Sequence, residues 1–239
     1  MATPPLVVGH RGWLQKYPEN TLVGLRAALD LGVDALEFDL HLSRDGRIVV
    51  IHDATLERTT DGAGRVADRS LGELRRLDAG GWFHPRFAGQ RIPTIEEVLE
   101  LAPPGVLLYA EVKDTRPEMV AKLLPYVRPR AGSIIVHSFG VGFLEAFRLA
   151  APEVRTGLLG RVDKLDLGAE ARRLGCWGIH PCMAGLTAGQ VAAWQAEGFK
   201  AMVWTVRDEA EAHSALALAP FAIGADCPDV LLRIQGRLA

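Results

Sequence analysis

The sequence predicts an α/β protein, a single (β/α)₈ barrel over residues 1–239 with a small insertion after its second strand. Three observations predict this fold. Short apolar runs alternate with amphipathic stretches, which is typical of parallel βαβ units. The chain has the length of one such barrel. Eight strand–helix units can close a barrel, whereas the alternative, an open doubly wound sheet, lacks its usual G-x-G-x-x-G turn here.

The expected strands are short apolar runs bounded by polar or glycine-rich turns. They lie at residues 6–10, 35–39, 106–112, 133–138, 155–159, 177–180, 200–205 and 221–223. Helical patterns follow at residues 21–31, 94–101, 117–127, 143–150, 165–174, 187–197, 208–218 and 229–234. We expect Asn20 and Thr94 as N-caps of the first two helices, Glu97 to complete a capping box with Thr94, and Gly32 to end the first helix.

Two segments interrupt this rhythm. Residues 40–53 contain a turn signal at Asp45-Gly46 and then a β-rich run, so we expect a hairpin rising from the second strand. With that turn, residues whose numbers sum to 91 lie opposite each other, and Asp39 faces His52. Residues 54–91 are rich in glycine and arginine. We expect them to form a cap-like insertion that covers the site without an independent core.

Composition excludes several classes of protein. The net charge of -2 offers no basic field for a nucleic-acid backbone. Three cysteines without C-x-x-C spacing (Cys176, Cys182 and Cys227) indicate reduced thiols. Neither a signal peptide nor an apolar run long enough for a transmembrane helix is evident. We therefore expect a cytoplasmic protein without stable membrane insertion or nucleic-acid binding; the sequence does not predict its oligomeric state.

Acidic residues gather where two neighbouring strands end. Alternate residues of a strand share a face, so Glu37 and Asp39 both point into the barrel mouth, and Glu111 and Lys113 repeat the pattern on the next core strand. Adjacent buried carboxylates repel unless a proton or cation lies between them. Three carboxylates favour Mg²⁺ or Ca²⁺ over zinc. The alternative is a buried ion network of these acids with Arg11 and Lys113.

Two histidines reach the same rim. His10 ends the first strand, and His52 returns on the hairpin. Hydrolysis of a phosphodiester needs one group to remove a proton and another to supply one, and a histidine pair can do both near neutral pH. Metal ligation by either imidazole is the competing interpretation. His137 and His180 also end strands and are expected at the pocket edge, without a catalytic role.

Basic and aromatic residues complete the expected site. Arg11 and Lys113 can hold phosphate oxygens and neutralise charge that builds in the transition state. Trp204 is expected to flank an apolar part of the substrate, with a place in the core as the alternative.

The chain resembles the glycerophosphodiester phosphodiesterase family along nearly its whole length. The matching motifs occur in the expected order: Gly9-His10-Arg11-Gly12, Pro18-Glu19-Asn20-Thr21, Glu37-Phe38-Asp39, Asp45-Gly46, His52-Asp53, Ile92-Pro93-Thr94, Glu111-Val112-Lys113, Ser138-Phe139, Val203-Trp204-Thr205-Val206 and Asp226-Cys227-Pro228-Asp229.

The resemblance implies a TIM barrel that hydrolyses glycerophosphodiesters to sn-glycerol 3-phosphate and an alcohol. It implies His10 and His52 as the acid–base pair, with attack by the glycerol 2-hydroxyl and a cyclic phosphate that water opens. It further implies that Mg²⁺ or Ca²⁺ is held by three acids, and that two basic residues contact phosphate. The acids are Glu37, Asp39 and Glu111, and the basic residues are Arg11 and Lys113.

Two departures from the family pattern concern the rim. Arg207 stands where the family usually has Asn, and Ala225 stands where Thr is common. Both affect the expected choice of alcohol group. The expected partner is a small glycerophosphodiester substrate. The alternatives are a lysophospholipase D-type phosphodiesterase on the same fold, or a barrel that binds a phosphate ligand without catalysis.

Overall fold

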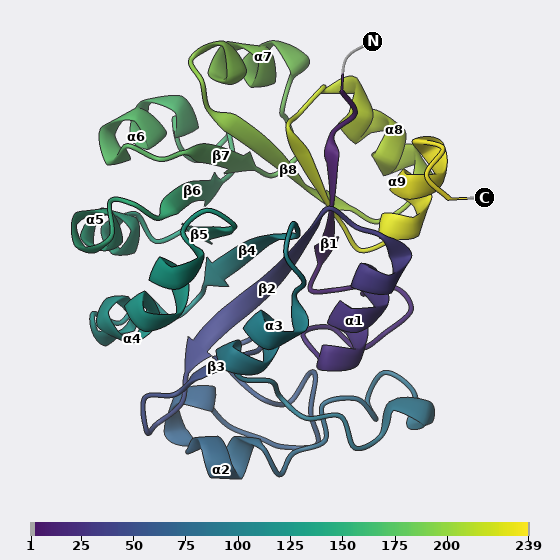
Figure 1. The fold of residues 1–239 in the computed structure, drawn as a ribbon, viewed down its shortest axis with the longest axis vertical. Coiled ribbons are helices and arrows are strands. Elements are labelled where there is room, and N and C mark those ends of the chain that lie inside the picture. Colours follow the sequence, from purple (N-terminus) through teal and green to yellow (C-terminus); the bar gives the residue numbers. More distant parts are fainter. Residues whose placement is uncertain (1–2, 239) are drawn as a thin grey trace.

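Eight parallel strands close into a barrel in the computed structural model, which describes residues 3–238 (Figure 1). The strands are β1 (Leu6–His10), β2 (Ala35–Leu42), β4 (Leu107–Val112), β5 (Ile134–Ser138), β6 (Arg155–Gly160), β7 (Gly178–Pro181), β8 (Lys200–Val206) and β9 (Ala222–Ala225). Each of these strands pairs with the next in this series, and β9 pairs with β1. The predicted (β/α)₈ barrel is confirmed, and the open-sheet alternative is wrong.

Helices surround the barrel and bury its outer face (Figure 1). They are α1 (Leu22–Leu31), α3 (Ile95–Leu101), α4 (Glu118–Val127), α5 (Val141–Ala150), α6 (Leu167–Leu174), α7 (Ala188–Ala196), α8 (Glu209–Ala217) and α9 (Pro228–Ile234). A 3₁₀ turn, η3 (Arg128–Arg130), follows α4. The main apolar core lies between strands and helices, and a smaller cluster that includes Tyr109 and Met202 fills part of the barrel interior. Among residues 3–238, no helix has both the length and the apolar character that crossing a bilayer requires.

The helix caps match the sequence pattern with one exception. Thr94 and Glu97 form the predicted capping box, and Gly32 ends α1 with φ 91°. The N-cap of α1 is Thr21, whose hydroxyl accepts from the Gly24 amide at 3.2 Å, so the prediction of Asn20 was wrong. Asn20 has φ 53°, and its side chain bonds to Asp39 instead of to the helix.

The hairpin forms in a register one residue from the predicted one. Strand β3 (Ile48–Val50) runs antiparallel to β2, and opposed residues have numbers that sum to 90, as in Leu40 with Val50. The loop contains three residues, 44–46, because the amide of Ser43 bonds to the carbonyl of Arg47. Gly46 supplies the left-handed conformation that such loops require, with φ 72°. Asp39 therefore lies opposite Ile51, and the prediction that it faces His52 was wrong.

Residues 54–91 form a loop-rich segment beside the hairpin. It contains η1 (Val66–Asp68), the short helix α2 (Leu71–Leu74) and η2 (Pro85–Phe87). Figure 1 shows this segment beyond β3, outside the ring of barrel helices. Its apolar side chains pack with the hairpin in a small buried cluster of Val49, Ile51, Leu56, Val66, Leu74, Ala79 and Ile92. Since Val49 and Ile51 come from the hairpin, the segment shares this cluster with the barrel.

Candidate active site

The strand register places the site residues in rows across the barrel mouth. His10 is the neighbour of Glu37 across β1 and β2. One level higher, Asp39, Glu111 and His137 are successive neighbours across β2, β4 and β5. Neighbouring residues of parallel strands point to the same side, so these side chains converge at the carboxyl ends of the strands, as predicted.

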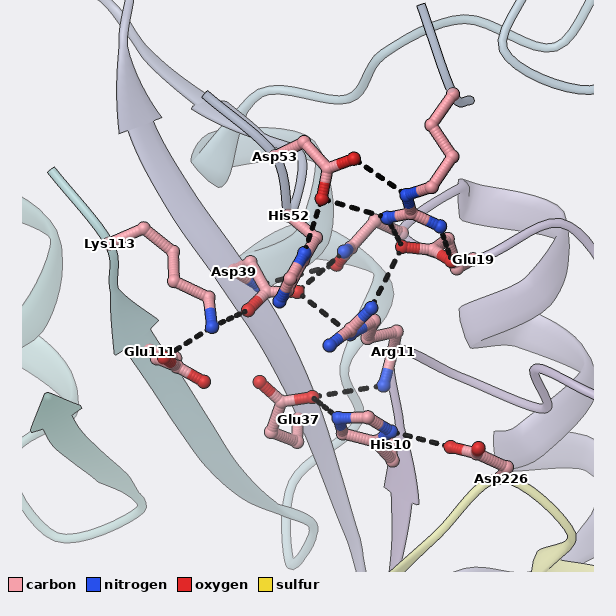
Figure 2. Close-up of polar contacts among 12 residues, drawn as sticks. His10, Arg11, Glu19, Glu37, Asp39, His52, Asp53, Glu111, Lys113 and Asp226 are labelled. Carbon is pink, nitrogen blue, oxygen red and sulfur yellow. Dashed lines mark hydrogen bonds and ion pairs between the residues drawn. The ribbon is translucent and has the colours of Figure 1, made fainter. Parts of the chain in front are cut away.

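Asp39 lies between two basic side chains (Figure 2). It is fully buried; Arg11 Nε is 3.2 Å from its Oδ2, and Lys113 Nζ is 3.4 Å from its Oδ1. Asn20 donates to Oδ2 at 2.7 Å and accepts from the Asp39 amide. Burial opposes ionisation, yet Arg11 and Lys113 together hold the pKa of Asp39 well below its usual range. The ion network that the sequence left as an alternative therefore exists around Asp39.

Glu37 and Glu111 lie in a less favourable environment. Burial, and then repulsion from Asp39, raises the pKa of Glu37 well above its usual range and that of Glu111 to about 7. Lys113 Nζ lies 2.5 Å from Glu111 Oε1. Oε2 of Glu37 accepts a hydrogen bond from the backbone N–H of Arg11. The buried Oε1 of Glu37 has no hydrogen-bond partner within residues 3–238. Three carboxylates face two cationic side chains, which leaves one negative charge for a cation or proton to balance.

A candidate metal site lies within this group. Glu37, Glu111 and His137 each offer one ligand atom, and these atoms lie within 4.8 Å of one another. The residues fit a divalent cation, because Glu37 Oε1 and His137 Nε2 are buried polar atoms for which the described chain provides no hydrogen bond. The structure thus brings two of the three predicted acids together and adds His137, which the sequence placed only at the pocket edge. Asp39 adjoins the group through Lys113.

Each of the two predicted histidines is oriented by an aspartate (Figure 2). The Nδ1 atoms of His10 and His52 lie 2.6 Å from Asp226 Oδ1 and Asp53 Oδ1 respectively. An ionised carboxylate only accepts, so Nδ1 carries the proton and Nε2 is left free to exchange one. His10 Nε2 lies 3.9 Å from Glu37 Oε2. Burial lowers the pKa of His52, although the neighbouring Asp39 opposes this effect.

A chain of ion pairs links His52 to Arg11 through residues that the sequence analysis did not assign to the site. Arg58 lies in the loop-rich segment and contacts Asp53 Oδ2 at 2.6 Å and Glu19 Oε2 at 2.7 Å. Glu19 Oε1 in turn accepts from Arg11 Nη1 at 3.0 Å. The motifs at 18–21, 52–53 and 226–229 contain Glu19, Asp53 and Asp226, but an acidic residue in a loop gives no sign of which base it will orient.

The site opens into a cavity of about 240 Å³. One side is polar and includes both histidines, Arg11 and Lys113; the other is apolar and is lined by Phe139, Leu159, Met202 and Trp204. No described residue of 54–91 lines this cavity.

Trp204 lies at the cavity wall, as expected. Its Nε1 donates to the His180 carbonyl at 2.8 Å, and its ring meets Phe139 edge to face at 5.7 Å. Of the two departures from the family pattern, Arg207 forms a surface ion pair with Glu211, and Ala225 is buried in β9.

Comparison with known proteins gives a consistent result. Residues 10–230 match the model of the glycerophosphoryl diester phosphodiesterase family. A glycerophosphodiester phosphodiesterase of Caldanaerobacter subterraneus is 33% identical over 235 residues, which cover 96% of this chain and 97% of that protein. A glycerophosphodiester phosphodiesterase of Bacillus subtilis is 29% identical, over a region that covers 96% of this chain and 86% of that protein.

Solved structures share the fold over almost the whole chain. A putative glycerophosphoryl diester phosphodiesterase from Silicibacter pomeroyi superposes with a TM-score of 0.90 at 27% identity, covering 100% of this chain and 96% of its own. A phosphodiesterase from Oleispira antarctica, solved with the product sn-glycerol-3-phosphate, superposes with a TM-score of 0.88 at 28% identity. The superposition covers 98% of this chain and 97% of that chain. The chain therefore belongs to the glycerophosphoryl diester phosphodiesterase family, and it is an enzyme of the phosphoric diester hydrolase class.

Proposed function

We propose that this enzyme hydrolyses small glycerophosphodiesters to sn-glycerol 3-phosphate and an alcohol, with His10 and His52 as acid and base and a divalent cation as cofactor. The observation that carries the proposal is the pairing of two imidazoles, each 2.6 Å from an aspartate, at one cavity that also contains the carboxylate cluster. The product bound to the Oleispira antarctica relative supports this substrate class.

The cation would be held by Glu37, Asp39 and Glu111, and oxygen ligands of this kind favour Mg²⁺ or Ca²⁺. Asp39 Oδ1 supports this assignment, because it is buried and its contact with Lys113 is 3.4 Å long, without hydrogen-bond geometry. When bound, the cation would stabilise negative charge that develops on the phosphoryl oxygens.

The basic side chains bind the substrate in this proposal. Both side chains line the cavity. Lys113 lies between Asp39 and Glu111, and Arg11 lies beside Glu37 and Asp39. Their charges suit the phosphoryl oxygens of a diester, and their acidic neighbours hold them in place before substrate arrives.

His52 is suited to accept a proton, because burial lowers its pKa and its imidazole is largely neutral at neutral pH. His10 then protonates the departing alkoxide from Nε2. The family resemblance implies that the accepted proton comes from the glycerol 2-hydroxyl. In both histidines the hydrogen bond from Nδ1 to aspartate stabilises the imidazolium that proton transfer creates.

The test is hydrolysis of glycerophosphocholine, with sn-glycerol 3-phosphate measured by a coupled dehydrogenase. We expect excess chelator to abolish turnover and Mg²⁺ or Ca²⁺ to restore it. His10→Ala and His52→Ala should each lower kcat by about 100-fold or more while the fold survives. His213→Gln is the matched control, since His213 is an exposed histidine on α8. Full turnover in chelator would remove the cation from the mechanism, and normal turnover in either variant would remove that histidine.

A lysophospholipase D-type activity is a second candidate because the cavity has an apolar side. Phe139 is 49% exposed beside Trp204 at the mouth, where an acyl chain could pack. Comparing lysophosphatidylcholine with glycerophosphocholine at equal concentration tests this candidate. A higher kcat/KM for the acylated substrate would favour it. A barrel that only binds a phosphate ligand would turn over neither compound.

A further inference from the structure

His137 occupies a position that the proposed mechanism does not use. It lies on β5, where its register neighbour on β4 is Glu111, so it belongs to the same row as two of the proposed metal ligands, Asp39 and Glu111. It is 1% exposed, and its Nε2 is a candidate ligand atom together with Glu37 and Glu111. Within the described chain this Nε2 makes no hydrogen bond. A buried nitrogen without a partner is costly, and a bound cation would provide one.

A second buried histidine fixes the orientation of the first. The Nδ1 atoms of His137 and His180 lie 3.0 Å apart, and the ring of Tyr109 packs edge to face against both imidazoles. Space for the His180 ring depends on two glycines, Gly157 on β6 and Gly178 on β7, the strand of His180 itself. A Cβ at Gly157 would lie 2.1 Å from Cε1 of this ring, and a Cβ at Gly178 would lie 2.7 Å from its Nε2.

This contact also bears on the tautomer of His137. Two Nδ1 atoms at hydrogen-bond distance require one donor and one acceptor. When His137 donates to His180, its Nε2 has a free lone pair beside the two carboxylates. The opposite tautomer places the proton on His137 Nε2; in either arrangement one buried Nε2–H of the pair has no acceptor within the described chain, on His180 in the first case and on His137 in the second. A metal-ligating histidine ordinarily donates its other ring N–H to a fixed acceptor, and His180 Nδ1 is placed to be that acceptor.

We propose that His137 Nε2 is a nitrogen ligand of the divalent cation, with His180 as the residue that positions it. The inference rests on the cation of the proposed function. It also changes the expected metal preference. Oxygen-only sites suit Mg²⁺ and Ca²⁺, whereas imidazole suits transition metals, so a mixed site binds Mn²⁺ more tightly than Mg²⁺.

The direct test is a crystal structure of the unaltered enzyme with Mn²⁺, using anomalous scattering to locate the ion. We expect the ion to be bonded to His137 Nε2 at about 2.2 Å, close to ordinary metal–imidazole distances. This measurement needs no variant, so a failure of a variant to fold does not affect it. An ion bonded only to carboxylates and water would overturn the role of His137 and leave the proposed function standing. If no ion binds at the cluster, both proposals fail.

Calorimetric titration with Mn²⁺ and Mg²⁺ gives the second readout. His137→Asn should weaken Mn²⁺ binding by about tenfold to a hundredfold, and Mg²⁺ binding by less than about threefold. His180→Phe should weaken Mn²⁺ binding by about tenfold through loss of the fixed tautomer. His41→Asn is the matched control, because His41 is a buried barrel histidine outside the cluster. Unchanged Mn²⁺ affinity in His137→Asn, with the fold verified by circular dichroism, would contradict the proposal.

Discussion

Glu111 should make the metal-free enzyme less stable as pH rises. Burial and the charge of Asp39 raise its pKa to about 7, against an ordinary value of 4.5. The folded chain therefore holds a proton that the unfolded chain loses. The resulting stability is fully present below pH 4.5 and is lost as pH rises through 7. The gap between these values corresponds to about 3 kcal/mol.

Urea unfolding in excess chelator at pH 5 and pH 8 measures this effect in the original protein and in Glu111→Gln. The comparison is needed because burial lowers the pKa of His52 and His137, which makes stability rise with pH up to about 6.5. These opposing contributions are common to both proteins. We expect the original protein to lose about 2–3 kcal/mol more than Glu111→Gln between the two pH values. Saturating divalent cation should reduce that loss.

Two outcomes would refute the reasoning. Equal pH dependence in both proteins would show that Glu111 ionises normally despite its burial. The control is Glu170→Gln, which removes a surface glutamate paired with Arg173 and should not change the pH dependence above pH 5. A change in the control as large as that in Glu111→Gln would show that the effect arises from net charge.

The remaining predictions concern the surroundings of the site. Asp226→Asn should lower kcat by about 100-fold in the diester assay, because His10 loses the carboxylate that fixes its tautomer; unchanged kcat would contradict this role. Arg58→Met should lower the free energy of unfolding, measured in urea, by about 1–2 kcal/mol; this figure is kept small because solvent screens the partly exposed Arg58. An unchanged free energy would show that the ion pairs of Arg58 with Glu19 and Asp53 do not stabilise the fold. Gly157→Ala should lower the melting temperature, since the new methyl group would overlap the His180 ring at a cost of about 1–3 kcal/mol; an unchanged value would contradict tight packing there.

The fold was predictable because parallel barrels repeat one local pattern. Each buried strand is short and apolar, each helix has a polar face, and capping residues such as Thr94 mark boundaries without reference to distant parts of the chain. The hairpin register was not predictable to the residue. Asp45-Gly46 is compatible with a two-residue or a three-residue loop. In the observed register, Val49 and Ile51 pack against apolar side chains of the loop-rich segment.

The candidate site was predictable where strand alternation determines it. Glu37, Asp39 and Glu111 follow from the alternation of side chains along strands. Other features depend on contacts between residues far apart in the chain. Asp226 meets His10 only because β9 pairs with β1 and closes the barrel. His137 reaches the carboxylates because β5 pairs with β4, and the His180 ring beside it fits only because two glycines leave room for it, which no local pattern indicates.

The loop-rich segment, which contains Arg58, matters for any attempt to shorten this enzyme. The segment contributes nothing to the wall of the cavity, so it looks dispensable for shortening the enzyme. Its removal would nevertheless strip the cover from Val49 and Ile51 and leave the carboxylates of Glu19 and Asp53 without their shared counter-ion. A truncated barrel would therefore need polar residues on the exposed face of the hairpin and a basic side chain in place of Arg58. Only then could its activity be compared with that of the full-length enzyme.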